Sequence, residues 1–282
     1  MTKNVLIASL HRSGGTLVVR LLDGHPACSV LPFETWHTQR KATFRLRHNL
    51  LFPFSSSARK LRTCGFRVYE RKLVSAYPEL DWTSYRARLL ELAARTGSPS
   101  ELYRRAATLY FVTFHASPLR DLLVNHCANL CLLSPWQLRR TFGDYRMVLS
   151  VRDPRAVFCS LERHRPGRAT ERSIPSFCDD WERSVRRYHL GDPSVISFRF
   201  EDLLGDPERV MRAVCADLGI AFDEAVLEPT FHGKRAQANT SFTREPGIDA
   251  SAIDSWRTQL RPPVQRAIEQ RLGPLLERLG YR

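Results

Sequence analysis

The sequence predicts an α/β fold with a central parallel β-sheet flanked by helices. Apolar runs at residues 5–8, 147–151 and 195–198 have the length and composition of buried strands. Stretches with helical periodicity and turn residues separate these runs along the chain. Strands that alternate with helices pair in parallel, because each crossover returns the chain to the same end of the sheet. The 282-residue chain is long enough to bury such a sheet.

The first half of the chain begins with the strand at residues 5–8, which a loop connects to a helix over residues 17–22. Gly24 and Pro26 end that helix, as glycine and proline commonly do. A short strand is expected at residues 29–31. The chain from residue 36 to about residue 140 is expected to be mainly helical, as an insertion into the α/β core.

The second half repeats the pattern of strand followed by helix. After the strand at residues 147–151, Asp153 and Pro154 open a helix, with proline suited to the first turn. Further helices are expected at residues 175–188, 207–218 and 263–279. Gly280 is expected to end the last of them. The sequence shows no repeat and no low-complexity segment, so we predict a single domain over residues 1–282.

Composition indicates a globular protein that attracts anions. Apolar residues make up 43% of the chain and charged residues 26%, while the formal net charge is +14. Of the 43 basic residues only five are lysines. Arginine offers a planar two-pronged donor to phosphate, sulfate or carboxylate, although a GC-rich coding sequence also explains the bias.

The cysteines and the hydropathy indicate a cytoplasmic location. The seven cysteines are odd in number and form no C-x-x-C motif, so neither a disulfide framework nor a zinc site is expected. No apolar stretch reaches the 18 residues of a membrane span, and the early first strand leaves no room for a signal peptide. No cluster of histidine, cysteine or carboxylate residues suggests a metal.

The segment SLHRSGGT lies between the first strand and the first helix and has the features of an anion-binding loop. A helix amino terminus presents free N–H groups and partial positive charge. Gly14 and Gly15 allow close backbone approach, Ser13 and Thr16 add hydroxyl groups, and Arg12 adds a cation. The G-x-x-x-x-G-K-[ST] motif is absent, which argues against a P-loop kinase. A simple tight turn is the alternative.

A second candidate anion site follows the strand at residues 147–151. Arg152 stands at the carboxyl end of this strand, and Ser160 lies two turns along the next helix. One ligand can therefore reach both side chains. The alternatives are a surface arginine paired with Asp153 and a serine that faces solvent.

These motifs together resemble the sulfotransferases that use 3′-phosphoadenylyl sulfate (PAPS), in particular the protein-tyrosine and bacterial branch. The resemblance rests on RSGGTLVVRLLDGHP followed by FET, on VRDPRAVFCSL, on SFRFEDLLGDPERVMRAVCADLGIAF, and on WRTQL and the closing LGY. It is weak between residue 36 and about residue 140. It implies a P-loop-like three-layer fold and transfer of a sulfuryl group from PAPS to a hydroxyl or amine, with release of adenosine 3′,5′-bisphosphate (PAP).

The resemblance also implies which residues bind the donor. The loop that holds the 5′-phosphosulfate corresponds to Arg12, Ser13, Gly14, Gly15, Thr16 and Leu17. The residues that hold the 3′-phosphate correspond to Arg152 and Ser160. A later loop that closes over the donor corresponds to Asn239, Ser241 and Arg244, where an ordinary surface loop is the alternative.

For the chemistry, the resemblance implies that Glu34 is the general base and that Arg12 stabilises charge on the departing phosphate. A glutamate in the first turn of the next helix is the alternative for Glu34, and His11 is a lesser base candidate. The chain departs from the family pattern at Leu133, where many relatives carry an active-site lysine. Gly15 also replaces a threonine of the family loop.

The sequence leaves the acceptor open. Ten basic residues and one acid fall between residues 40 and 72. This stretch is a solvated face, a lid over an acidic or amphipathic acceptor, or a surface for anionic membranes. The acceptor is expected to be a small molecule, glycan, lipid or peptide, and no nucleic acid partner is expected. The rival functions are a catalytically weak PAPS- or PAP-binding protein and a basic binder of nucleic acid or membrane surfaces.

Overall fold

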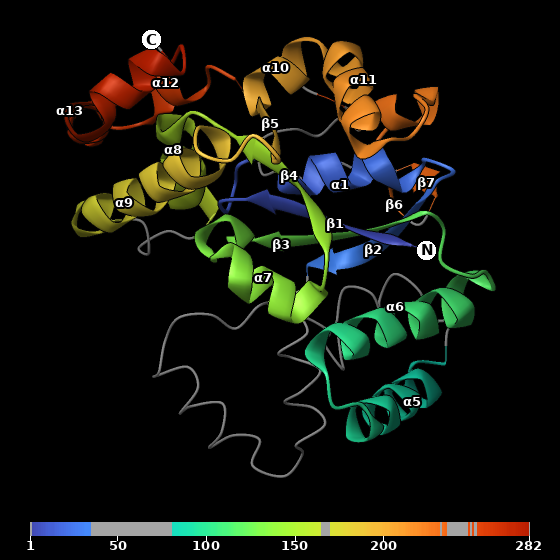
Figure 1. Ribbon diagram of the computed structural model, residues 1–282. Helices are drawn as coiled ribbons and strands as arrows, with labels where there is room; N and C mark the ends of the chain where they lie inside the picture. Colours follow the sequence, from blue (N-terminus) through green and yellow to red (C-terminus); the bar gives the residue numbers. More distant parts are fainter. Residues whose placement is uncertain are drawn as a thin grey trace. The chain divides into compact units, whose positions relative to one another are not determined.

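The computed structural model describes residues 2–34, 81–164, 170–231, 233–235, 248, 250 and 253–281. A five-stranded sheet runs in the order β2-β3-β1-β4-β5 (Figure 1). Its strands are β1 (Lys3–Ser9), β2 (Cys28–Glu34), β3 (Leu122–Ala128), β4 (Tyr145–Val151) and β5 (Ile196–Arg199). A separate antiparallel pair consists of β6 (Thr230–Phe231) and β7 (Lys234–Arg235). The five-stranded sheet is flanked by helices, so the predicted α/β fold class is confirmed.

The register of the sheet is parallel where its strands are paired residue by residue. In β4 and β5, Val148 lies opposite Ile196 and Val151 opposite Arg199. In β2 and β3, Val30 lies opposite Val124, and the register shifts between Val30 and Glu34. The middle of β1 is fully buried, as the apolar run VLIA requires of a central strand.

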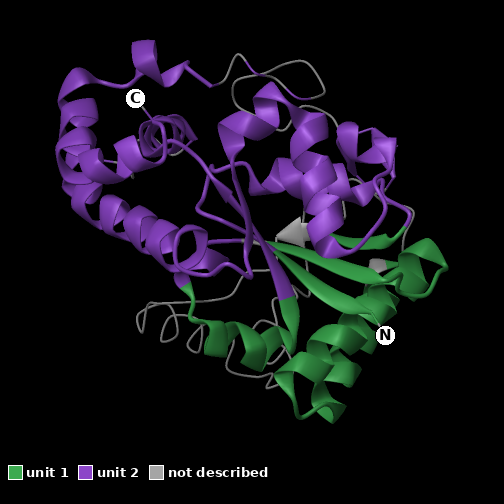
Figure 2. Ribbon diagram, turned by 45° about the horizontal axis from the view of Figure 1, so that its top comes forward, with its two compact units in different colours: residues 1–6, 27–127, 133–145 green, residues 7–26, 128–132, 146–282 purple. Residues whose placement is uncertain are grey.

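The chain forms two compact units (Figure 2). The first contains residues 1–6, 27–127 and 133–145, and the second contains residues 7–26, 128–132 and 146–282. The division between the two ranges falls within β1, β3 and β4, so each of these strands contributes to both units.

The first unit contains helices α5 (Trp82–Arg95), α6 (Pro99–His115) and α7 (Pro135–Phe142). Helix α6 packs against both α5 and α7. A buried aromatic cluster joins α5 to α6, with the Tyr85 and Phe114 ring centroids 4.7 Å apart. Ser134 caps α7 by accepting a hydrogen bond from the Gln137 backbone N–H, which explains why the helix begins at Pro135.

The expectation of a mainly helical stretch between residues 36 and 140 is wrong in one respect, because β3 lies within it. Only Leu122, Leu123 and Val124 form an apolar run there, and Asn125 and His126 follow them. Both polar residues are nevertheless buried, at 0% and 5% exposure. Strand β3 lies between β2 and β1 in the sheet. It was not predicted, because two of its buried positions carry polar side chains.

The second unit contains most of the helices found in the described residues. They are α1 (Gly15–Asp23), η1 (Leu130–Leu132), α8 (Pro154–His164), η2 (Glu171–Ser173), α9 (Ile174–Ser184), η3 (Val185–His189), α10 (Phe200–Gly205), α11 (Pro207–Leu218), η4 (Glu224–Leu227), α12 (Trp256–Gln259) and α13 (Pro262–Arg278). Helix α13 packs against α8 and α9, and α12 packs against α8. The predicted helix at residues 175–188 is α9 followed by one π-helical turn, η3.

Two findings concern the environment of the protein. No helix in the described residues is both long and apolar enough to cross a membrane. Among the same residues, the cysteines recorded as free are Cys28, Cys131, Cys159, Cys178 and Cys215, all buried. Burial raises the pKa of Cys131 to about 12, so its thiol is unreactive.

Candidate functional site

The loop between β1 and α1 has a backbone shape that few sequences allow. Arg12 and Gly14 both have positive φ angles, 69° and 89°. The carbonyl oxygen of Gly14 accepts hydrogen bonds from the N–H groups of Leu17 and Val18 and so starts the helix. Gly14 offers no side chain to cap the helix, so the first two N–H groups of α1, those of Gly15 and Thr16, are left for an anion.

Phe200, the first residue of α10, packs so closely on Gly14 that no side chain fits at that position. A β-carbon at Gly14 would lie 2.1 Å from the Cδ2 atom of the Phe200 ring, and that ring is 8% exposed. The loop backbone therefore packs directly on Phe200, which a larger residue at this position would prevent.

Changing Gly14 to alanine should lower the free energy of unfolding by about 1–3 kcal/mol through overpacking, with about 1 kcal/mol more for the left-handed backbone. Urea denaturation measures this loss. Gly273→Ala in α13 is the matched control, because its methyl group meets nothing within 4 Å and should stabilise the helix by about 0.5–1 kcal/mol. Unchanged stability of Gly14→Ala would show that Phe200 moves aside freely.

Arg152 follows the last residue of β4 and faces this loop. Its side chain is buried, and Nη1 donates a hydrogen bond to the carbonyl oxygen of Arg12 at 3.0 Å. The guanidinium carbon lies 5.0 Å from the centroid of the Phe200 ring. Burial lowers the pKa of Arg152, and the charge of Arg12 adds to this, while Glu201 opposes it. A second bond, from Ser150 Oγ to the carbonyl of Ser13 at 2.7 Å, also ties the loop to β4.

Ser160 joins the same group of side chains from α8. Its hydroxyl is 1% exposed and accepts a hydrogen bond from Arg12 Nε at 2.9 Å. Arg12, Arg152 and Ser160, which are far apart in the sequence, therefore lie together in the second unit. Ser160 does not face solvent and Arg152 is no surface arginine, while Asp153 forms its ion pair with Arg155 at 2.7 Å.

The remaining predicted site residues lie in the loop and the first turn of α1, at the end of β2, or outside the described residues. Thr16 and Leu17 lie in the first turn of α1 and are partly exposed, while Ser13 is buried. Glu34 is the last residue of β2, so it lies in a strand rather than in a helix. The predicted donor-covering residues Asn239, Ser241 and Arg244 fall outside the described residues.

Three hydrogen bonds of Asn129 and Arg187 were missed from the sequence. Asn129, at φ 70°, accepts a hydrogen bond from the His11 N–H through Oδ1 at 3.2 Å, and its own N–H donates to the Ser9 carbonyl at 2.7 Å. Arg187 in η3 donates from Nη1 to the Leu132 carbonyl at 3.3 Å. An asparagine directly after a strand is a signal for a left-handed turn, but β3 itself was not predicted.

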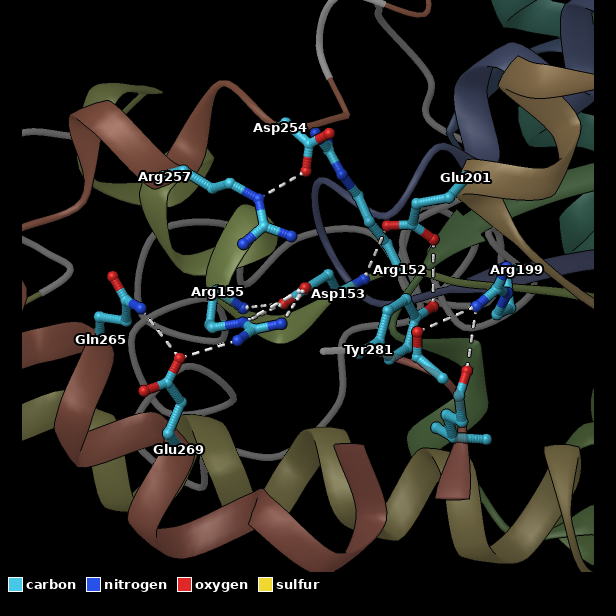
Figure 3. A network of polar contacts seen from close by, with 12 residues as sticks. Arg152, Asp153, Arg155, Arg199, Glu201, Asp254, Arg257, Gln265, Glu269 and Tyr281 are labelled. Carbon is cyan, nitrogen blue, oxygen red and sulfur yellow. Dashed lines mark hydrogen bonds and ion pairs between the residues drawn. The ribbon is translucent and has the colours of Figure 1, made fainter. Parts of the chain in front are cut away.

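The helix behind Arg152 is anchored by a buried ion-pair network (Figure 3). Arg155 contacts Asp153 at 2.7 Å and Glu269 of α13 at 2.8 Å, and its guanidinium lies 4.2 Å from the Trp256 ring. Burial disfavours the charge of Arg155, but the two carboxylates outweigh this and raise its pKa. The network holds α8, and with it Ser160, against α12 and α13.

In the described part of the chain, no group of three or more histidine, cysteine, aspartate or glutamate side chains is placed to hold a metal ion. The arrangement instead offers a helix amino terminus, two arginines and a serine hydroxyl. A parallel α/β fold with such a loop after its first strand belongs to the class of P-loop-like folds.

Comparison with known protein families identifies the family to which this chain belongs. A model described as the sulfotransferase family matches residues 4–224, so the chain belongs to the sulfotransferase family and is a sulfotransferase enzyme. This confirms the resemblance inferred from the motifs.

Solved structures show the same fold. The sulfotransferase domain from the Synechococcus PCC 7002 olefin synthase is 22% identical with a TM-score of 0.65, covering 97% of this chain and 94% of that one. The sulfotransferase domain from the curacin biosynthetic pathway is 20% identical with a TM-score of 0.61, covering 98% of each chain.

Proposed function

We propose that this sulfotransferase uses PAPS as donor and transfers its sulfuryl group to a hydroxyl or amine, releasing PAP. The observation that carries the proposal is the meeting of Arg12, Arg152 and Ser160 beside the amino terminus of α1. A ligand with two separate anionic groups fits two arginines and a helix terminus better than a single phosphate does.

The predicted donor-binding residues fall into two groups, one for the 5′-phosphosulfate and one for the 3′-phosphate. The loop of Arg12, Ser13, Gly14, Gly15, Thr16 and Leu17 would hold the 5′-phosphosulfate. Its backbone donors would be the N–H groups of Gly15 and Thr16, because those of Ser13 and Leu17 already donate to Leu10 and Gly14. Arg152 and Ser160 would hold the 3′-phosphate. Because burial and Arg12 both disfavour the charge of Arg152, a dianion beside it relieves an unfavourable arrangement and gains affinity.

The chemistry requires an in-line displacement at sulfur. The acceptor oxygen or nitrogen forms a bond to sulfur while the bond between sulfur and the phosphate oxygen breaks. Glu34 would take the acceptor proton, and Arg12 would stabilise the negative charge left on the phosphate of PAP. In this scheme positioning and electrostatics supply most of the rate enhancement, as in phosphoryl transfer.

A cation is also needed where many relatives carry a lysine and this chain has Leu133. Arg187 is the candidate we favour, because its side chain is bonded to the carbonyl of the preceding residue, Leu132. Asn239, Ser241 and Arg244 would cover the donor from the later loop.

The proposal also covers the extent of the domain, the class of acceptor and the cellular location. We propose a single functional domain over residues 1–282, with the basic stretch at residues 40–72 on the acceptor side. The acceptor would be a small molecule, glycan, lipid or peptide, with no nucleic acid partner. Free, buried cysteines support a reducing, cytoplasmic setting. The resemblance to bacterial sulfotransferases supports a bacterial source.

Calorimetric titration with PAP, and with ADP for comparison, tests the donor. ADP keeps adenine and adds a second 5′-phosphate, but it lacks the 3′-phosphate. Each charge-assisted contact is worth roughly 1.5–3 kcal/mol, so ADP should bind at least about tenfold more weakly. Arg152→Ala should remove most of this preference.

Arg146→Ala is the matched control for this titration, because Arg146 lies on β4, the strand that precedes Arg152. Its side chain is exposed and donates to the Asp217 carbonyl. Equal binding of PAP and ADP would contradict the PAPS assignment. Tight PAP binding without turnover on any acceptor would favour the weak-binder alternative.

A further inference from the structure

In each of three consecutive residues, Val151, Arg152 and Asp153, one backbone group is bonded by a side chain from a different part of the second unit. The Val151 carbonyl accepts from Tyr281 Oη at 3.3 Å, and the Arg152 carbonyl accepts from Trp181 Nε1 at 3.0 Å. The Asp153 N–H donates to Glu201 Oε1 at 3.0 Å. We call Trp181, Glu201 and Tyr281 the strand-end clamp.

The clamp acts on the backbone and leaves the Arg152 side chain to the site. That side chain bonds to the Arg12 carbonyl and lies over Phe200. The clamp residues Trp181 and Tyr281 are deeply buried, at 1% and 6% exposure. A buried clamp with fixed partners holds the turn in one conformation, which a strand end followed by a helix does not do by itself.

Two members of the clamp also bond to each other. Tyr281 Oη lies 3.1 Å from Glu201 Oε2, so its one proton faces both this oxygen and the Val151 carbonyl (Figure 3). Arg199 brings Tyr281 to this place, because it pairs with Asp202 at 2.6 Å and donates to the Leu279 carbonyl at 3.1 Å.

The two Glu201 oxygens have different partners, because Oε1 accepts from the Asp153 N–H and Oε2 from the Tyr281 hydroxyl. Burial raises the pKa of Glu201, with the charge of Asp153 acting in the same direction and Arg152 opposing it. The Tyr281 hydroxyl is the donor toward both Glu201 Oε2 and the Val151 carbonyl. A glutamine side chain keeps both partners, since its oxygen accepts from Asp153 and its NH₂ group donates to Tyr281.

We propose that Glu201 and Tyr281 are positioning residues that hold Arg152 in place for the 3′-phosphate of the donor without touching the ligand. The inference rests on the proposed function, because it assigns the 3′-phosphate to Arg152. Its consequence is that donor selectivity depends on a contact between α10 and the segment that follows α13, far from Arg152 in the sequence.

The test compares the dissociation constants of PAP and adenosine 5′-phosphate, which differ only in the 3′-phosphate. Tyr281→Phe should weaken PAP binding about three- to tenfold and leave adenosine 5′-phosphate within about twofold, since one buried hydroxyl contact is lost. Glu201→Ala should do the same, and Glu201→Gln should retain the selectivity of the unaltered enzyme. Tyr110→Phe in α6 is the matched control for loss of a buried tyrosine hydroxyl.

A merely structural role would weaken both nucleotides equally in Tyr281→Phe and Glu201→Ala, and that result would overturn the inference. So would full selectivity in both variants, or loss of selectivity in Glu201→Gln equal to that in Glu201→Ala. Thermal unfolding identifies a variant that does not fold, in which case the other position decides. Equal binding of both nucleotides by the unaltered enzyme would overturn the proposed function, and this inference with it.

Discussion

Replacing Arg12 with alanine should lower kcat by about 10²- to 10³-fold, the usual loss when one preorganised donor to a developing anion is removed. The Arg12 guanidinium is fixed in position, because its Nε donates a hydrogen bond to the buried hydroxyl of Ser160. Arg152 bonds to the carbonyl of residue 12 rather than to its side chain, so the loop keeps that contact in the variant. The positive φ strains alanine no more than arginine.

The measurement is PAP release from PAPS with a panel of simple phenols, alcohols and amines. Arg12→Lys keeps the charge but loses the Nε contact to Ser160, so its kcat should fall between the kcat of Arg12→Ala and that of the unaltered enzyme. Arg146→Ala, on the exposed end of β4, should match the unaltered enzyme. An Arg12→Ala enzyme with full turnover would remove Arg12 from the mechanism.

The parts of the fold that could be predicted are those whose local sequence alone determines them. Strand β4 reads as a continuous apolar run because it is buried on both faces, and α11 begins and ends at Pro207 and Leu218 as expected. Strand β3 could not be predicted, because Asn125 and His126 are buried by their neighbours in the sheet. Nothing in the local pattern shows that these polar residues lie inside.

The same division applies to the site. The proximity of Arg152 and Ser160 could be predicted, because a strand end and a position two turns along the next helix fix their separation. The direct bond between Arg12 and Ser160 was not predicted. Tyr281 and Trp181 were missed altogether, because their contacts with the end of β4 exist only after α9 and α13 have packed in the second unit.

Two like charges lie close together in the candidate site. Arg12 and Arg152 are like charges joined through one carbonyl, and burial lowers the pKa of Arg152 further. Phe200 under the guanidinium and Glu201 behind it offset part of this cost. The protein thus maintains a concentrated positive charge where the net charge of +14 also draws anions toward the surface.

Changing Glu34 to glutamine should lower kcat by about 10²- to 10⁴-fold, because glutamine cannot accept the proton of the attacking group. Glutamine has the same shape, and Glu34 ends β2 in backbone register with His126, so the strand itself should be retained. PAP binding should stay within about twofold, since PAP carries no acceptor and needs no base.

The matched control is Glu101→Gln, an exposed glutamate in the first turn of α6, which should leave kcat unchanged. Calorimetry with PAP and turnover of PAPS, measured on the same preparations, separate binding from chemistry. If PAP affinity and kcat fell together, Glu34 would be a residue that shapes the site rather than the base. If kcat were unchanged, another group would take the proton, and His11 would be the next residue to replace.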